Sequence, residues 1–145
     1  MKPYRTAMVI MIIAALLVPA VAAQEAEGHG YIVTPIGDEQ LKEKPLPAPM
    51  NYATITQGES DWYSTYVAPG TTELLIDLNW GDSSNSLRLV IYAPDAALGP
   101  YYDTYDGTAN GRICVRIKDS VSLYPGTWRF EVYGYDGILN AHAYP

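Results

Sequence analysis

Alternation of apolar and polar side chains is the feature of this chain that most constrains its fold. Every second residue is apolar in four runs, at 74–80, 87–91, 113–117 and 128–132. Such alternation directs one set of side chains toward a core and the other toward solvent, as in a half-buried β-strand. Between the runs, Gly, Pro, Asp and Asn favour reversals of the chain. These patterns predict an all-β fold, an antiparallel, jelly-roll-like β-sandwich of about seven to eight strands.

Weaker runs of the same kind complete the predicted sandwich. They lie at 52–56, 62–67 and 138–144. Trp80 and Trp128 belong to the apolar sets of the strong runs, so we expect both indole rings in the core. The length suits one domain of ordinary size, which we place at 51–145.

Residues 1–23 have the three parts of an export signal. Lys2 and Arg5 supply positive charge, an uncharged apolar stretch follows, and small residues end the segment at Ala23. We therefore expect cleavage before Gln24. The alternative is an uncleaved anchor, but the apolar stretch is short for a bilayer, which requires about 20 residues. The sequence thus predicts a secreted or cell-surface protein with no membrane insertion once the signal is removed.

Residues 24–50 differ in composition from the rest of the chain. They are rich in Pro, Gly and charged residues, and the sequence LPAP at 46–49 favours extended backbone. We interpret this region as an extended arm or linker, with a flexible spacer as the simplest form. The apolar triplet Tyr31, Ile32 and Val33 leaves two alternatives open. It would lie as a short strand either on its own domain or on a neighbouring molecule.

Charge and cysteine content exclude some classes of partner. The net charge is −7, and both positive residues of the expected signal would leave with it. Such an acidic chain repels nucleic acid and anionic membrane surfaces. The single cysteine, Cys114, excludes an internal disulfide. Two alternatives stay open for Cys114, a buried small side chain, which is the commoner fate of a lone cysteine, and an exposed thiol. If its apolar neighbours face inward, Cys114 faces outward between Arg112 and Arg116, where cations would favour the thiolate unless a second layer or the arm covers that face.

Four segments in order carry a resemblance to a known family. They are QGESDWY at 57–63, LLIDLNW at 74–80, LRLVIYAPD at 87–95 and PGTWRFEVY at 125–133. In this order they resemble the pre-peptidase C-terminal domain family, over roughly residues 52–144. The resemblance implies a jelly-roll-like sandwich with an accessory role in secretion, substrate attachment or surface display. Domains of that family typically follow a catalytic module, and this sequence carries none.

No arrangement of residues in the sequence indicates catalysis. The two histidines, His29 and His142, lie in no recognisable nucleophile motif, and Cys114 has no histidine near it in sequence. The same three residues lack the close spacing of zinc ligands. We therefore expect a protein that is not an enzyme.

Calcium is the most specific cofactor hypothesis. The ion takes several oxygen ligands, and Asp103, Asp106 and Asn110 lie in one glycine-containing loop. Asp82 and Asp95 lie in other loops that a sandwich could bring to the same end. The alternative interpretation is that these residues only form turns.

Tyrosines in the same loop suggest a binding surface. The chain holds 13 Tyr and a single Phe, and tyrosine suits half-exposed interfaces. Tyr101, Tyr102 and Tyr105 lie beside the acidic residues and could stack on sugars or contact a protein. The alternative is that they cover the edges of the sandwich.

Three functions remain compatible with these observations. The first is an exported, non-catalytic binding module whose partner is a cell-surface polymer or a protein. The second is a structural subunit of an extracellular layer or fibre, in which residues 31–33 add a strand to a neighbour's sheet. The third is an accessory or inhibitor that acts in trans on a secreted peptidase.

Overall fold

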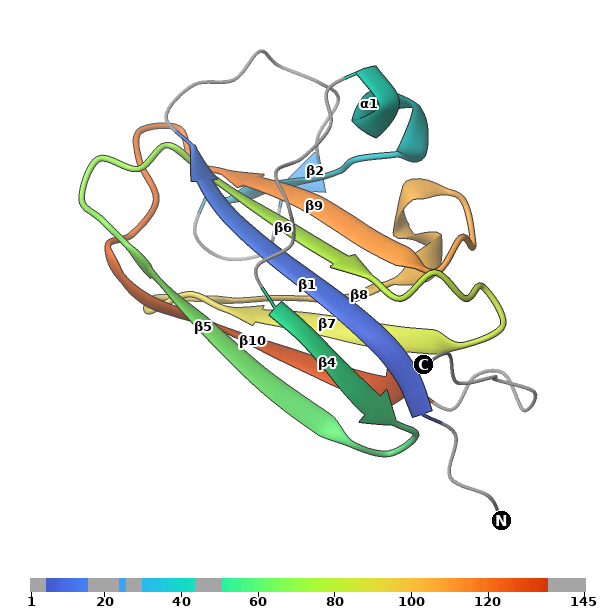
Figure 1. The fold of residues 1–145 in the computed structure, drawn as a ribbon. Helices are drawn as coiled ribbons and strands as arrows, with labels where there is room; N and C mark the ends of the chain where they lie inside the picture. Colours follow the sequence, from blue (N-terminus) through green and yellow to red (C-terminus); the bar gives the residue numbers. More distant parts are fainter. Residues whose placement is uncertain (1–4, 16–23, 26–29, 44–50, 136–145) are drawn as a thin grey trace.

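Two antiparallel β-sheets face each other in the computed structural model, which describes residues 5–15, 24–25, 30–43 and 51–135 (Figure 1). One sheet has six strands in the order β2-β3-β9-β6-β1-β4, and the other has four in the order β5-β10-β7-β8. Every neighbouring pair is antiparallel. The predicted all-β sandwich is therefore confirmed.

The strands have the following bounds. The six-stranded sheet contains β2 (Gln24–Glu25), β3 (Ile32–Pro35), β9 (Arg112–Lys118), β6 (Glu73–Asn79), β1 (Arg5–Ala15) and β4 (Asn51–Thr56). The four-stranded sheet contains β5 (Ser60–Val67), β10 (Gly126–Tyr135), β7 (Ser86–Tyr92) and β8 (Ala97–Tyr102). The helix α1 (Asp38–Glu43) and the 3-10 turn η1 (Asp103–Asp106) lie beside the sheets. None of the described helices has the length and apolar character needed to cross a bilayer.

One apolar core lies between the two sheets, and the alternating runs supply most of it. Trp128 is fully buried and Trp80 nearly so, as predicted. The other fully buried members of the runs come from both sheets: Leu74, Ile76, Leu78, Leu89, Ile91, Val115, Ile117, Phe130 and Val132. Burying one such side chain contributes about 1.5–3 kcal/mol, so this core is the main source of stability.

β1 is an interior strand of the six-stranded sheet, between β6 and β4 (Figure 1). Its backbone pairs with β6 from Val9 to Ala15, and the side chains of Met8 and Ile10 lie in the core. These residues belong to the segment that the sequence predicts as an export signal. A strand covered on both faces is a nearly continuous apolar run, which is also the pattern of a signal. The segment thus has the sequence pattern of a signal and the structure of an interior strand, and cleavage would remove that strand.

The region predicted as an arm contributes to the domain. β3 pairs with β9, and the side chains of Tyr31 and Val33 are buried in the core. The Tyr31 hydroxyl donates a hydrogen bond to Asp95 Oδ1 at 2.6 Å, and its ring meets Trp128 edge-on at 5.4 Å. Of the two alternatives for this triplet, the structure shows the strand on its own domain. The spacer interpretation is wrong for residues 31–43, because long-range pairing outweighs their loop-like composition.

α1 and the residues before it cover part of the outer face of the six-stranded sheet. There, Ile36, Leu41, Leu75 and Cys114 form a small second apolar cluster. Burial raises the pKa of the Cys114 thiol far above its usual value, and the nearby Asp77 carboxylate adds to this effect. Of the two alternatives for Cys114, the structure shows the buried thiol. Arg112 and Arg116 do flank the thiol, but they pair with Asp77 and Glu73.

The buried thiol leads to a labelling prediction. At pH 8, Cys114 of the native protein should resist a water-soluble thiol reagent and become labelled on denaturation, because the neutral buried thiol is a poor nucleophile. Leu41→Ala removes a side chain that packs with it and should speed the labelling of native protein. Mass spectrometry of timed samples measures both rates. Rapid labelling of the native wild-type chain would contradict the burial.

Candidate binding site

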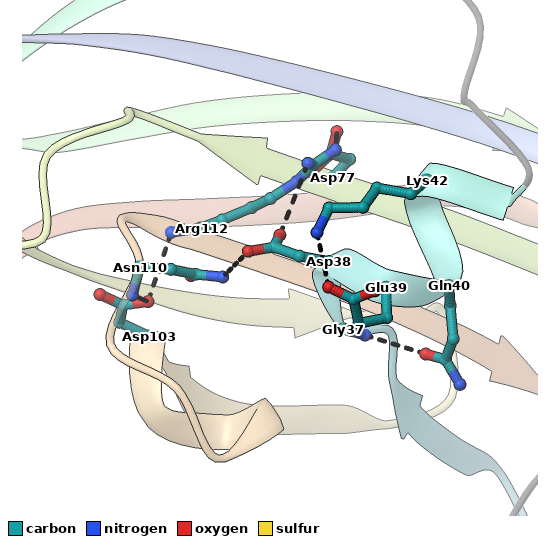
Figure 2. Close-up of polar contacts among 9 residues, drawn as sticks. All are labelled: Gly37, Asp38, Glu39, Gln40, Lys42, Asp77, Asp103, Asn110 and Arg112. Carbon is teal, nitrogen blue, oxygen red and sulfur yellow. Dashed lines mark hydrogen bonds and ion pairs between the residues drawn. The ribbon is translucent and has the colours of Figure 1, made fainter.

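Asp103, the first predicted calcium ligand, holds the loop 103–111 closed. Its Oδ1 accepts hydrogen bonds from the backbone N–H groups of Asn110 at 3.0 Å and Arg112 at 3.3 Å (Figure 2). Its Oδ2 accepts one from the N–H group of Gly111 at 3.0 Å. Asp103 is buried, with only 5% of its surface exposed. These contacts give the Asp103 carboxylate a structural role in closing the loop.

The other predicted calcium ligands also have hydrogen-bonding partners. Asp106 accepts the N–H of Thr108, and Asn110 donates to Asp38 at the start of α1. The remaining two acids lie in other turns, Asp82 bonded to Ser84 and Asn85, and Asp95 bonded to Tyr31. In the part of the chain that the structure describes, no three His, Cys, Asp or Glu side chains gather closely enough to hold a metal ion. The calcium hypothesis stays a prediction.

Arg112 links the same loop to the six-stranded sheet. Its Nε and one terminal nitrogen each donate a hydrogen bond to an Asp77 oxygen at 2.7 Å. Hydrogen bonding to Asp77 is the main cause that raises the pKa of Arg112. Asp38 lies 3.9 Å from the other terminal nitrogen. Arg112 thus pairs with Asp77 of β6 and lies near Asp38 of α1, and these contacts hold the loop and α1 against the sheet.

The predicted tyrosine cluster does not form one exposed surface. Tyr101 points into the core and is only 7% exposed, with its ring 4.8 Å from that of Tyr105. The Tyr105 hydroxyl donates to the backbone oxygen of Val33. Tyr102 lies next to Tyr101 in β8 and therefore projects from the opposite face, where its ring meets that of Tyr135 at 5.3 Å. The expectation is wrong for Tyr101, because a buried ring cannot stack on a ligand.

A different set of aromatic residues covers the outer face of the four-stranded sheet. Trp62 and Tyr66 of β5 are 48% and 66% exposed, and Tyr135 at the end of β10 is 43% exposed. Alternation along each strand places further residues on the same face. We call this surface the aromatic face; it comprises Trp62, Tyr66, Arg88, Val90, Tyr92, Tyr102, Arg129, Glu131, Tyr133 and Tyr135.

The rings of the aromatic face are held by their neighbours. Arg129 places its guanidinium 4.7 Å from the centre of the Trp62 ring, and Trp62 lies 5.6 Å from the ring of Tyr92. Arg88 lies 4.6 Å from the centre of the Tyr133 ring. Such cation–π contacts contribute about 0.5–1 kcal/mol at exposed sites. These contacts fix the orientation of the Trp62 and Tyr133 rings.

Glu131 supplies polar character at the middle of this face. In the strand register it lies between Trp62 of β5 and Val90 of β7. Its two carboxylate oxygens accept hydrogen bonds from Ser60 at 3.1 Å and Tyr92 at 3.4 Å, and an Arg88 nitrogen lies 3.8 Å away. Tyr, Trp and Arg are the residue types that are enriched at binding interfaces relative to the rest of a protein surface.

Sequence reasoning missed the aromatic face although a signal for it was present. In residues 62–66, Trp62, Ser64 and Tyr66 alternate with Tyr63 and Thr65. The period shows which residues share a face, but both sets contain an aromatic residue, so it does not show which set faces solvent. In the structure the set with Trp62 is exposed. Tyr63 points the other way, and partial burial raises its pKa to about 12.

Comparisons with known proteins add little to this description. No family model matches the chain, and no solved structure matches it significantly. The chain is 46% identical over 43 residues to a protein of Archaeoglobus fulgidus described as uncharacterized. This match covers 30% of the present chain and 59% of that protein.

Proposed function

We propose that this chain is an exported, non-catalytic β-sandwich that binds an extended sugar polymer at the cell surface through its aromatic face. The observation that carries the proposal is the exposure of Trp62 and Tyr66 on the outer face of one sheet, with Arg129 beside the indole ring. Export rests on the predicted signal at residues 1–23. The resemblance to pre-peptidase C-terminal domains supports the same kind of accessory role.

The spacing of the exposed rings favours a long ligand. Trp62 and Tyr66 lie four residues apart in β5, which corresponds to about 13 Å along a strand. A ligand that contacts both rings therefore has to extend beyond a single sugar ring. Each aromatic ring offers an apolar surface for the C–H groups of a sugar, while Glu131 and Arg129 supply hydrogen-bonding groups for hydroxyls. The negative net charge of the chain disfavours nucleic acid as the alternative polymer.

The assembly alternative loses its main structural support. It required residues 31–33 to add a strand to a neighbouring molecule, but this segment pairs with β9 of its own domain. Tyr31 and Val33 would have to leave the core to serve as a donated strand. We therefore place polymer binding first.

Substitution of the exposed rings tests the proposal. With a panel of soluble polysaccharides in affinity electrophoresis, Trp62→Ala should weaken binding about tenfold, which corresponds to about 1.4 kcal/mol for one lost ring contact. The double variant with Tyr66→Ala should show no retardation. Val121→Ala serves as the control, because it removes an exposed apolar side chain from the loop between β9 and β10. Wild-type retardation of the double variant would contradict the proposal.

A further inference from the structure

β5 forms one edge of the four-stranded sheet and is the longest of the described strands that end a sheet (Figure 1). It has eight residues, Ser60–Val67, while β2, β4 and β8 have two, six and six. Edge strands of natural proteins are commonly protected by proline, charge or a bulge. β8, the other edge of the same sheet, contains Pro100 and has a register shift between Leu89 and Ile91 of its neighbour. β5 contains no proline, pairs with β10 in unbroken register and has one charged residue, Asp61.

The backbone of β5 presents a row of hydrogen-bonding groups on the side away from β10. The N–H group of Gly134 in β10 donates to the carbonyl oxygen of Glu59, which therefore points toward β10. Backbone groups alternate in direction along a strand, so residues 61, 63, 65 and 67 also direct theirs toward β10. The residues between them direct their N–H and C=O groups the other way, and among the described residues these groups have no backbone partner. We call this row the β5 edge; it consists of Ser60, Trp62, Ser64 and Tyr66.

We propose that the β5 edges of two copies of this chain pair antiparallel and join two four-stranded sheets into one sheet of eight strands. The proposal goes beyond polymer binding and does not depend on it. A two-fold axis through Ser64 places Trp62 of each copy opposite Tyr66 of the other. All three residues belong to the β5 edge, so each opposed pair can exchange two backbone hydrogen bonds. Such an interface uses the same patch on both subunits and closes at two copies.

This register joins like faces of the two sheets. Trp62 and Tyr66 belong to the aromatic face, so the aromatic faces of the two copies become continuous. Both rings are exposed in the single chain, and in the pair each lies beside a ring of the other copy. Opposed aromatic side chains stabilise antiparallel strand pairs. On the other face of the sheet, Tyr63 lies opposite Thr65 of the second copy, and both side chains are half-buried in the single chain.

The charges of β5 are compatible with this pairing. Asp61 of one copy lies opposite Val67 of the other, so no acidic side chain faces another across the two strands. The two Asp61 residues are six positions apart along the ladder, which corresponds to about 20 Å. The Debye length is about 8 Å at physiological ionic strength, so their repulsion is largely screened. The net charge of −7 on each copy is screened in the same way.

Opposite charges at Ser64 test the two-fold pairing in the full chain. Ser64 is exposed, so lysine and glutamate should leave the fold intact. Analytical ultracentrifugation of the wild type should show a dimer with a dissociation constant in the micromolar range, because one pair of edge strands is smaller than a standard interface. Ser64→Lys and Ser64→Glu each place two like charges opposite each other and should raise that constant about tenfold or more. An equal mixture of the two variants should form a heterodimer with a constant close to the wild-type value.

Ser86→Lys is the control for the added charge. Ser86 lies at the start of β7, away from the β5 edge, so this variant should dimerise as the wild type does. A wild-type chain that stays monomeric up to about 1 mM would overturn the inference. A dimer that persists in both Ser64 variants, or a mixture that associates no more tightly than either variant alone, would overturn it as well.

Hydrogen exchange followed by NMR gives a second measurement with the wild-type chain. The amides of Trp62, Ser64 and Tyr66 should exchange about tenfold more slowly when about nine-tenths of the chain is dimeric, since exchange then proceeds from the remaining monomer. The amides of Tyr63 and Thr65 bond to β10 in both states and should slow less. Equal slowing along the whole strand would contradict pairing through the β5 edge. Polysaccharide binding is measured separately, so its absence would contradict the proposed function and leave this inference standing.

Discussion

Replacing Asp103 with alanine should lower the free energy of unfolding by about 3 kcal/mol, because three backbone N–H groups would lose their acceptor in a closed loop. Each buried donor without a partner costs about 1–3 kcal/mol, and water reaching the opened loop would recover part of this. Urea denaturation followed by tryptophan fluorescence measures the change. The expected loss is a large share of the 5–15 kcal/mol that stabilises a typical domain.

Two related variants make the Asp103 result specific. Asp103→Asn keeps one acceptor oxygen and should be less destabilising than alanine. Asp106→Ala removes a bond to the exposed N–H of Thr108 and should cost no more than about 1 kcal/mol. Equal effects of the two alanine variants would contradict the role given to Asp103.

Melting with added calcium tests the metal hypothesis on the same proteins. If the loop binds calcium, the ion should raise the melting temperature of the wild type by mass action, and both alanine variants should lose that increase. A wild-type melting curve that is unchanged by calcium and by chelator would leave Asp103 with a role in the loop alone.

Alanine at Gly134 should destabilise the protein by about 2–3 kcal/mol, the upper range for forcing an extra methyl group into a packed site. The new Cβ would lie 2.3 Å from the Thr56 carbonyl oxygen, and the neighbouring atom is backbone, so β10 itself has to move. That movement would strain the two hydrogen bonds between Gly134 and the turn at Gly58 and Glu59. Thermal melting monitored by circular dichroism measures the loss.

Gly37→Ala is the matched control for Gly134→Ala. No atom lies within 4 Å of a Cβ built on Gly37, and its backbone is outside the left-handed region. Gly37 also caps the N-terminus of α1, where its carbonyl oxygen accepts the N–H of Leu41 and alanine is less favourable than glycine. The change should therefore cost no more than about 1 kcal/mol. A similar loss for both variants would show that close packing at Gly134 is not the cause.

The strong alternating runs predicted the core correctly, and the reason is physical. A strand that slipped by one residue would move its whole apolar set to the solvent side, so the pattern fixes which residues are buried. Ile76, Leu89 and Phe130 are fully buried, each in a different strand. Neighbouring polar positions in β7 and β10 such as Arg88 and Arg129 face outward, as the period requires.

The candidate site could not be predicted in the same way, because its residues come together only in the folded sheet. Trp62 and Arg129 lie far apart in the sequence, and their contact depends on the register between β5 and β10. Adjacent tyrosines were grouped by sequence, although Tyr101 and Tyr102 point to opposite sides of β8. Local composition also did not predict that β3 belongs to the domain, because its partner β9 comes much later in the chain.

The cover over Cys114 has a consequence for the proposed export of this chain. Oxidising compartments join accessible thiols into disulfides, and a chain with one cysteine could only cross-link to another molecule. With Leu41 and Ile36 packed over the sulfur, two folded copies cannot bring their Cys114 atoms into contact. The short helix thus protects the folded protein from covalent dimerisation, and this protection begins only when residues 36–41 have docked on the sheet.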